Sequence, residues 1–188
     1  MNPIRVDGPA VEPVSLADAR AHLRLDDTHE DDLVAALIEA GRLLLESATR
    51  LIFINQSWRL ILEEAPRGMR LHLPLAPIIA ITEIRAIDAQ GAASVVDPQE
   101  YRLRAGAQPP TLMLEESFPR LPGGIEIDLE AGFGPAPENV PAPLRQALRM
   151  LVARWFEERG DGVGEPETGV LPPDVALMIA PYRHLRLS

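Results

Sequence analysis

The segment at residues 140–160 constrains the fold more than any other stretch, because its pattern is that of one helix with both ends marked. Pro143 suits the first helical position, and Gly160 suits the left-handed position just past a helix. Between them, apolar residues recur about every 3.6 positions: Leu144, Ala147, Leu148, Leu151, Val152, Trp155 and Phe156. We predict a helix over 143–159 that forms the centre of the core.

A second, longer helix is predicted over 29–50. Its main apolar stripe comprises Leu33, Leu37, Ala40, Leu44, Ala48 and Leu51, and three residues widen it: Ile38, Leu45 and Ile52. Gly41 costs up to about 1 kcal/mol relative to alanine inside a helix, so we expect it to mark close packing against another helix. We expect the 143–159 helix to pack against this one, with core residues Leu37 and Leu44 on one side and Leu148, Leu151 and Trp155 on the other.

Two shorter helices complete a small bundle. One spans about 15–25, where Ser15 can cap the first turn and Asp18 stands at the capping-box position. The other spans 173–180. Before it, residues 160–172 are rich in glycine, proline and acid, which predicts a flexible loop. Residues 181–188 form a tail of alternating apolar and basic residues.

Between the helices, the hydrophobic period changes to two. Residues 125–130 alternate strictly, as a strand with one solvated face does. Similar short runs, separated by turn residues, occur from Gln56 onward, near 69–73, 78–87, 94–96, 100–104 and 111–114. We therefore predict an α+β fold: a small helical bundle with an antiparallel β-sheet or small barrel inserted at about 56–131. The whole of 1–188 is expected to form a single domain.

The composition restricts the possible partners. The net charge is −10, and all 18 basic residues are arginine. Such an acidic chain is poorly suited to sequence-independent binding of nucleic acid, which requires clustered basic residues. It contains no cysteine, so disulfides and thiolate metal sites are excluded. No signal-peptide pattern or membrane-length apolar run is present, so we expect a cytoplasmic protein without a membrane partner.

The densest acidic cluster lies at residues 26–32, where five carboxylates accompany one histidine. One hypothesis is a small metal-dependent hydrolase that uses this cluster, although the spacing does not match a calcium loop. An acidic first turn of a helix explains the cluster better, because the free N–H groups and the dipole there attract negative charge. Asp27 or Thr28 would then be the N-cap. We therefore expect no metal and no cofactor.

Catalytic patterns do not emerge from the sequence. The four histidines fall in four separate predicted elements: His22, His29, His72 and His184. The glycines at 160–164 follow a helix instead of a strand, so they are not a dinucleotide-binding loop. A chain with strong helices, an alternating sheet and no convergent polar site is typical of a scaffold or interaction module. We expect that it is not an enzyme.

Several short motifs follow one another in a specific order. They are V-S-L-A-D-A-R-A-H-L-R-L at 14–25, Q-S-W-R-L at 56–60, A-G-F-G at 131–134, the run at 140–159, and L-M-I-A-P-Y-R at 177–183. In this order they resemble the head–tail connector (adaptor) proteins of long-tailed phages, prophages and gene transfer agents. The resemblance extends over roughly residues 13–186.

The resemblance implies a structural ring, commonly of twelve copies, beneath the portal protein of the particle. The ring would join the portal to the next neck protein, often called the stopper, around a channel through which DNA passes without specific binding. The protein would be cytoplasmic during assembly and would then become part of the neck of a virion or virion-like particle. The resemblance also implies that the tail at 181–188 docks on the portal, with Tyr182, Arg183, Leu185 and Arg186 as candidates.

In such a ring, the outer face of the 143–159 helix has two interpretations. This face carries three arginines, Arg145, Arg149 and Arg154. They pair either with acids of the same subunit or with acids of the next subunit. Three alternative functions also stay open: a stopper or tail-terminator neck protein, a DNA-packaging partner and the hydrolase. Stoppers and terminators are usually dominated by a β-barrel, so the two strong helices count against them.

Overall fold

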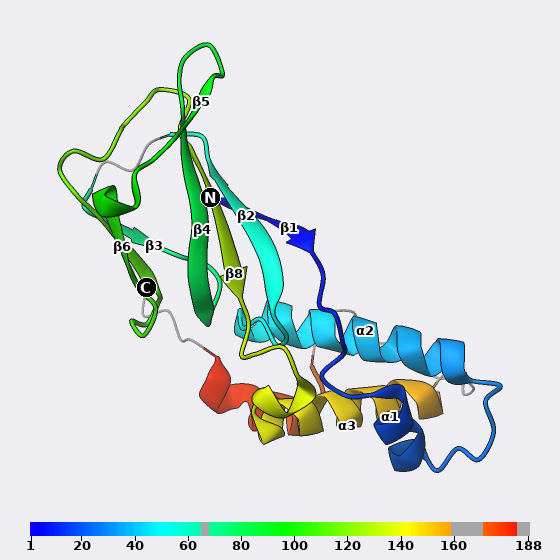
Figure 1. Cartoon of the computed structure of the whole chain (residues 1–188). Coiled ribbons are helices and arrows are strands. Elements are labelled where there is room, and N and C mark those ends of the chain that lie inside the picture. The colour runs from blue at the N-terminus through cyan, green and yellow to red at the C-terminus, as the bar shows by residue number, and fades with distance from the viewer. Residues whose placement is uncertain (65–67, 159–170, 184–188) are drawn as a thin grey trace. The chain divides into compact units, whose positions relative to one another are not determined.

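The computed structural model describes residues 1–64, 68–158 and 171–183 (Figure 1). The chain divides into two compact units. We call Met1–Pro9 with Asn55–Phe133 the sheet unit, and Ala10–Ile54 with Gly134–Ser188 the helical unit. The predicted α+β fold class is confirmed, since helices and antiparallel sheets are both present. The prediction left open an antiparallel sheet or a small barrel. Within the described residues the sheets do not close into a barrel, so the sheet alternative is correct.

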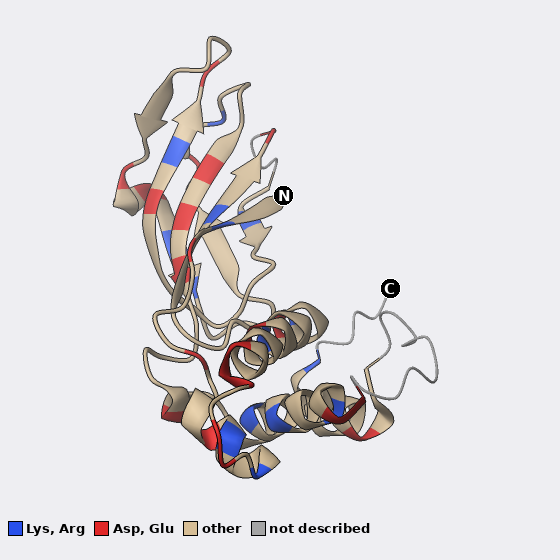
Figure 2. Ribbon diagram, turned by 90° about the vertical axis from the view of Figure 1, so that its right-hand side faces the viewer, with Lys and Arg blue, Asp and Glu red and all other residues tan. Residues whose placement is uncertain are grey.

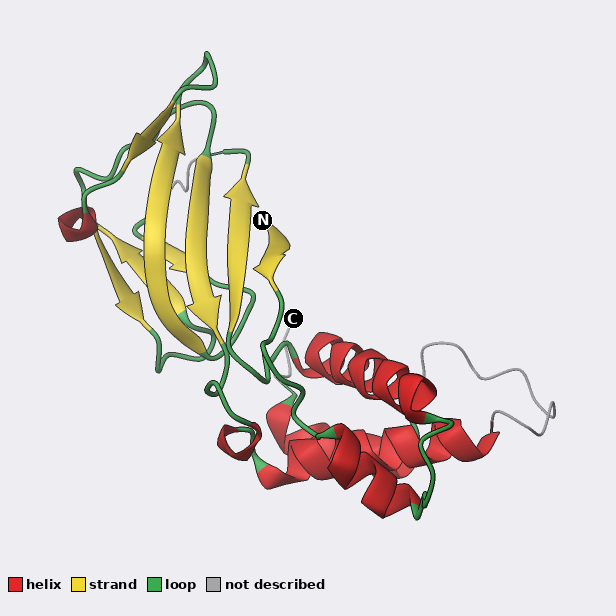
Figure 3. Cartoon of the chain, turned by 45° about the vertical axis from the view of Figure 1, so that its right-hand side comes forward, coloured by secondary structure: helices red, strands yellow, loops and turns green. Residues whose placement is uncertain are grey.

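The larger sheet of the sheet unit has five antiparallel strands (Figure 3). In spatial order they are β1 (Asn2–Asp7), β2 (Gln56–Leu62), β8 (Ile125–Ala131), β4 (Ile78–Ile87) and β5 (Ala93–Val95). The register pairs Leu60 of β2 with Ile127 of β8, and Ile127 with Ile84 of β4. These three side chains are fully buried, so one face of the sheet forms the core of the unit.

The smaller sheet has three antiparallel strands in the order β3 (Arg70–His72), β7 (Thr111–Leu114) and β6 (Tyr101–Arg104). A short 3-10 turn, η1 (Pro98–Glu100), precedes β6. Leu112 and Leu114 of the central strand are buried, as is Phe118 after it. The strands β4 and β7 have the bounds that were predicted, 78–87 and 111–114. These bounds were predictable because turn residues mark both ends of each run.

Strand β1 was not predicted, because residues 1–14 carry prolines and were expected only to be extended. All six residues of β1 are exposed, and the strand pairs with β2 at the edge of the sheet. Pro3 lacks a backbone donor and the register shifts between Arg5 and Asp7, two features typical of a protected sheet edge. The β structure therefore includes a strand outside the predicted range of 56–131.

The helical unit contains α1 (Leu16–Leu23), α2 (Asp31–Thr49), α3 (Ala142–Glu158) and α4 (Pro173–Ile179). Two 3-10 turns flank them, η2 (Pro137–Asn139) before α3 and η3 (Ala180–Tyr182) after α4. The four predicted helices are thus present, each with ends within two residues of the prediction. None of the helices in the described ranges is both long and apolar enough to cross a membrane.

The helix ends agree with the prediction only in part. Ser15 caps α1 by accepting the N–H of Asp18 at 3.0 Å, as expected. Helix α2, however, begins two residues later than predicted, with Glu30 as its N-cap, so the assignment of the cap to Asp27 or Thr28 was wrong. Asp27 instead accepts the N–H of His29 at 3.1 Å, a local turn that keeps this residue outside the helix.

Helices α2 and α3 pack closely at Gly41. A Cβ atom at this position would lie 2.6 Å from Leu148 Cδ1, 3.6 Å from Trp155 and 3.9 Å from Leu151. Only a residue without a side chain permits this approach, which explains a glycine inside a long helix. The predicted contact between the two helices through these three residues of α3 is therefore confirmed.

The buried face of α2 differs from the predicted stripe by one position. Its fully buried residues include Val34, Ile38 and Leu45, whereas Leu37 and Leu44 are partly exposed. Adjacent positions on a helix are separated by about 100°, so the two stripes lie side by side. Both stripes are apolar, and periodicity alone could not decide which one faces α3. On α3, Leu148 and Leu151 are buried and Trp155 is partly exposed.

Some predictions fall on residues that the structure does not describe. Gly160, most of the loop predicted at 160–172, and the docking candidates Leu185 and Arg186 lie outside the described ranges.

Candidate interaction surfaces

A buried ion cluster forms around Arg42, of which 1% is exposed. Its guanidinium donates two hydrogen bonds to Glu12, at 2.8 Å from Nε and 3.1 Å from Nη2, and one to Glu46 at 3.1 Å. Burial opposes the charged form, but the hydrogen bonds and charges of the two carboxylates raise the pKa of Arg42. The other oxygen of Glu46 accepts the N–H of Phe53 at 2.9 Å. The cluster therefore fixes α2 to the segments before α1 and after α2.

The arginines on the outer face of α3 differ in their contacts. Arg145 donates to the carbonyl of Val140 at 3.1 Å. Arg154 lies 3.6 Å from Glu158, one turn along the same helix. No salt bridge joins Arg149 to a carboxylate within the described ranges. Pairing within the described part of the subunit therefore accounts for only one of the three, and the inter-subunit interpretation stays open.

The C-terminal segment is attached to the helical unit by one side of α4. Val175 and Ile179 are buried, and α4 packs on α3. Leu177, between these two anchors, is 77% exposed, more than any other large hydrophobic residue described. Tyr182 is partly exposed and Arg183 is exposed. Tyr182 and Arg183 thus follow directly after a helix that is anchored on α3. The exposed Leu177 of this helix was not predicted as a docking residue.

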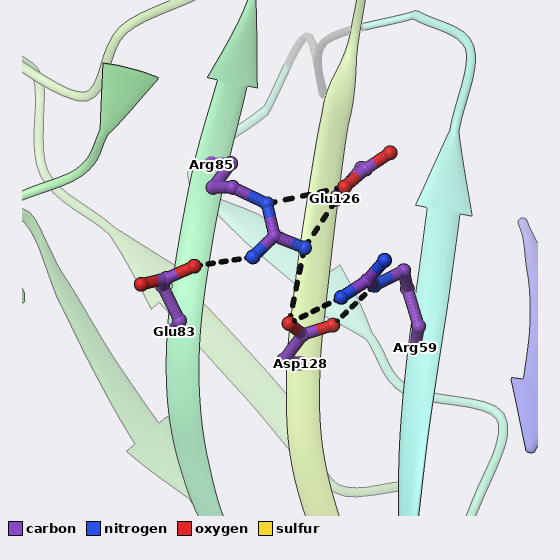
Figure 4. A network of polar contacts seen from close by, with 5 residues as sticks. All are labelled: Arg59, Glu83, Arg85, Glu126 and Asp128. Carbon is purple, nitrogen blue, oxygen red and sulfur yellow. Dashed lines mark hydrogen bonds and ion pairs between the residues drawn. The ribbon is translucent and has the colours of Figure 1, made fainter. Parts of the chain in front are cut away.

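A second charged cluster lies on the larger sheet, where β2, β8 and β4 run side by side (Figure 4). Asp128 accepts two hydrogen bonds from Arg59, at 2.6 and 2.9 Å. Arg85 donates to Glu126 at 2.9 and 3.1 Å and to Asp128 at 3.0 Å, and it also pairs with Glu83. The register of β4 on β8 shifts twice before Glu83. From Glu83 onward β4 alternates in step with β8 and β2, so all five charges lie on the face opposite the apolar core.

The two arginines of this cluster lower the pKa of its central carboxylate, Asp128. The hydrogen bonds from Arg59 lower the pKa of Asp128 below its ordinary value, and Arg85 adds to the effect against the opposing influence of partial burial. Figure 2 shows the resulting bands of acidic and basic residues along the strands. Arg59, Asp128, Arg85 and Glu126 pair across neighbouring strands, and Glu83 pairs with Arg85 on the same strand. The cluster therefore supplements the register of the three strands, and its charges largely neutralise one another.

The acidic segment at 26–32 does not form a metal site in the structure. Asp31 lies 3.4 Å from Arg20 of α1, and Asp27 serves the local turn described above. In the parts of the chain that the structure describes, no three His, Asp or Glu side chains are grouped so that they could hold a metal ion. Glu30, Asp31 and Asp32 occupy the start of α2, and Asp31 connects it to α1.

Neither a protein-family model nor a curated protein matches the chain, but solved structures do. A chain of the neck of an empty GTA particle, computed with C6 symmetry, is similar with a TM-score of 0.84 and 26% identity. A chain of the virion of a native gene transfer agent (GTA) particle gives 0.82 and 28%. A chain of the neck of a native GTA particle, computed with C12 symmetry, gives 0.79 and 28%.

Each of these comparisons covers 100% of this chain and 98% of the other. The similarity therefore includes both units and their order along the chain, not one common motif. The resemblance to proteins of gene transfer agent particles, predicted from short motifs, is confirmed at the level of a neck component.

Proposed function

We propose that this chain is a structural component of the neck of a phage-like particle, the head–tail adaptor, and that it has no catalytic role. The observation that carries the proposal is the whole-length similarity to chains from gene transfer agent necks, at TM-scores from 0.79 to 0.84. In this proposal the protein is cytoplasmic until assembly. It then forms a ring, of twelve copies in the usual arrangement, through which DNA passes.

The position directly beneath the portal is the finer part of the proposal. Stoppers and tail terminators are mainly β-barrels, whereas half of this chain is a helical unit built on α2 and α3. The sheets in the described ranges are open. These features favour the adaptor over the other neck proteins. The partners would be the portal on one side, the stopper on the other, and further copies of the chain around the ring.

Docking on the portal is assigned to the C-terminal segment, with Tyr182 and Arg183 as the described candidates and Leu185 and Arg186 beyond them. Tyrosine and arginine are enriched among the residues that dominate binding energy at protein interfaces. Truncation after Ala180 removes all four and keeps the buried anchors Val175 and Ile179. The truncated protein should fold as the full chain does and should fail to join portal rings. Normal joining would contradict the assignment.

The function itself is tested by deleting the gene in a cell that produces the particles. Electron microscopy should then show DNA-filled heads without tails, and mass spectrometry of wild-type particles should find the chain in the purified neck. Tailed, infective or gene-transferring particles without the chain would overturn the proposal. A gel-shift assay at low salt should show no binding to DNA, since a packaging partner would bind it.

A further inference from the structure

Helix α2 has a second apolar face, which we call the outer arc. It consists of eight positions: Leu33, Ala36, Leu37, Ala40, Leu43, Leu44, Ser47 and Ala48. At 3.6 residues per turn these positions span an arc of about 140°. Ala36, Ala40, Leu43 and Ser47 are exposed, and the other four are partly exposed. The outer arc lies beside the face that packs on α3, so α2 is apolar over most of its circumference.

The charged residues of α2 all lie outside the outer arc. They are Asp31, Asp32, Glu39, Arg42 and Glu46. A helix face that contacts only water usually carries charged and polar residues, but the outer arc carries a single serine. Leu43 at its edge is 42% exposed. An apolar helix face that is left open or half open to water is typical of a site of interaction with another molecule.

The described part of the chain leaves this surface open, because four of its eight positions are exposed and four are partly exposed. The stretches that the structure does not describe, 65–67, 159–170 and 184–188, contain only four large aliphatic residues between them: Val163, Val170, Leu185 and Leu187. The two leucines belong to the tail that is proposed to dock on the portal, and the internal stretch carries mainly glycine and charged residues. A partner outside the chain is therefore the better explanation of the outer arc.

We infer that the outer arc packs against a second copy of this chain, as part of the contact between neighbouring subunits of a ring. The inference rests on the proposed function. The similar chains come from necks computed with C6 and C12 symmetry, and in a cyclic ring every subunit contacts two others through unlike surfaces. Interfaces between identical subunits are more apolar than other protein surfaces, and this agrees with an arc without charge.

The dimensions of α2 suit this role. Its 19 residues give a rod about 28 Å long, enough for a helix to lie along a neighbouring subunit. Three alanines on the outer arc permit the close approach of a neighbouring subunit: Ala36, Ala40 and Ala48. The leucines beside them supply the apolar area that is removed from water: Leu33, Leu37 and Leu44. DNA would not be a suitable partner, because its phosphates require positive charge.

A matched pair of substitutions tests the inference. Ala35 and Ala40 are both exposed residues inside α2, but only Ala40 belongs to the outer arc. Ala40→Arg should lower the yield of tailed particles at least tenfold, whereas Ala35→Arg should leave it unchanged. Thermal unfolding of both purified variants should match that of the wild type, because neither side chain is buried. Equal yields of tailed particles for the two variants would overturn the inference. If the chain were still detected in the neck of those particles, the proposed function would remain intact.

Photo-crosslinking identifies the partner. With p-benzoylphenylalanine at position 40, irradiated particles should give a product of twice the mass of the chain, which maps to a second copy. The same group at position 35 should give much less of it. A product with the portal or another neck protein, or a crosslink within one chain, would overturn the inference. Absence of the chain from particles would instead reject the proposed function.

Discussion

Both units contain a cluster in which arginine pairs with carboxylates, but the cluster is buried in the helical unit and partly exposed in the sheet unit. In the helical unit Arg42 is enclosed, with 1% of its side chain exposed, and its partner Glu46 has 7% exposed. In the sheet unit Arg59 and Asp128 have 37% and 21% of their side chains exposed. Removing one partner of a buried pair leaves an uncompensated charge and costs about 3–5 kcal/mol, whereas exposed pairs contribute about 1 kcal/mol or less.

The difference indicates two distinct roles. The Arg42 cluster fixes the segments that enter and leave α2, at the point where the chain approaches both crossings to the sheet unit. It makes the helical unit sensitive to any change of charge in its interior. The cluster on the sheet supplements a register that backbone hydrogen bonds and the apolar core already specify. The sheet should therefore tolerate its loss.

The largest effect is expected for Arg42→Met, which should lower the free energy of unfolding by about 3–5 kcal/mol, because the buried carboxylate of Glu46 would lose the guanidinium that neutralises its charge. Urea denaturation measures the change. The triple variant Arg42→Met, Glu12→Gln, Glu46→Gln removes the charges together and should recover part of the loss. A loss below 1 kcal/mol for the single change would show that the two clusters are energetically equivalent.

The packing of α2 on α3 in the helical unit is tested by Gly41→Ala. The added methyl group would lie 2.6 Å from a fully buried Leu148 side chain, so overpacking should cost about 1–3 kcal/mol in spite of the better helix propensity of alanine. In a Leu148→Ala background the same change should become neutral or stabilising, because the obstructing atoms are gone. If both backgrounds respond alike, α2 and α3 do not meet closely at this point.

On the sheet, Asp128→Asn should cost about 1 kcal/mol at pH 7. The lowered pKa of Asp128 in the folded state means that its contribution is fully present above its unfolded pKa of about 4. The contribution disappears as the pH falls through the folded value, so the variant and the wild type should have equal stability in strong acid. Chemical denaturation between pH 7 and pH 2 measures this difference, and a constant difference would exclude ionisation as its cause.

The smallest effect on stability is expected for Arg154→Ala. Its pair with Glu158 is long and exposed, so the free energy of unfolding should change by less than about 0.5 kcal/mol. Particle assembly gives the informative measurement. A defect in assembly without a change in thermal unfolding would favour contact of this arginine with the next subunit, and normal assembly would favour its role as a solvated residue.

The sequence predicted the fold well where local signals agree. Residues 111–114 and 78–87 are bounded by turn residues, and α1 has a capping serine, so their ends could be located from the chain alone. Strand β1 could not be predicted, because it is held at the sheet edge by backbone pairing and buries none of its side chains. The N-cap of α2 was misplaced because several consecutive acids suit that position equally.

The candidate surfaces were less predictable. The docking segment and the arginines of α3 were named from motif resemblance and from the outer face of one helix. The Arg42 cluster was missed, since Glu12 lies thirty positions away and no spacing rule joins the two. The alternating charges of β8 indicated one solvated face, but not their partners on β2 and β4. Similarly, the apolar pattern of α2 concealed a second face, because both stripes looked suitable for the core.

The strand order of the larger sheet determines when this protein can fold during synthesis. Strand β8 lies between β2 and β4, yet it is the last of the five to leave the ribosome. Until then β2 and β4 each have an unpaired edge and an uncovered apolar face. These are the features that expose a nascent chain to aggregation. Because α3 and α4 also follow β8 along the chain, both units should reach their final form only in the last third of translation, after which the finished chain can assemble.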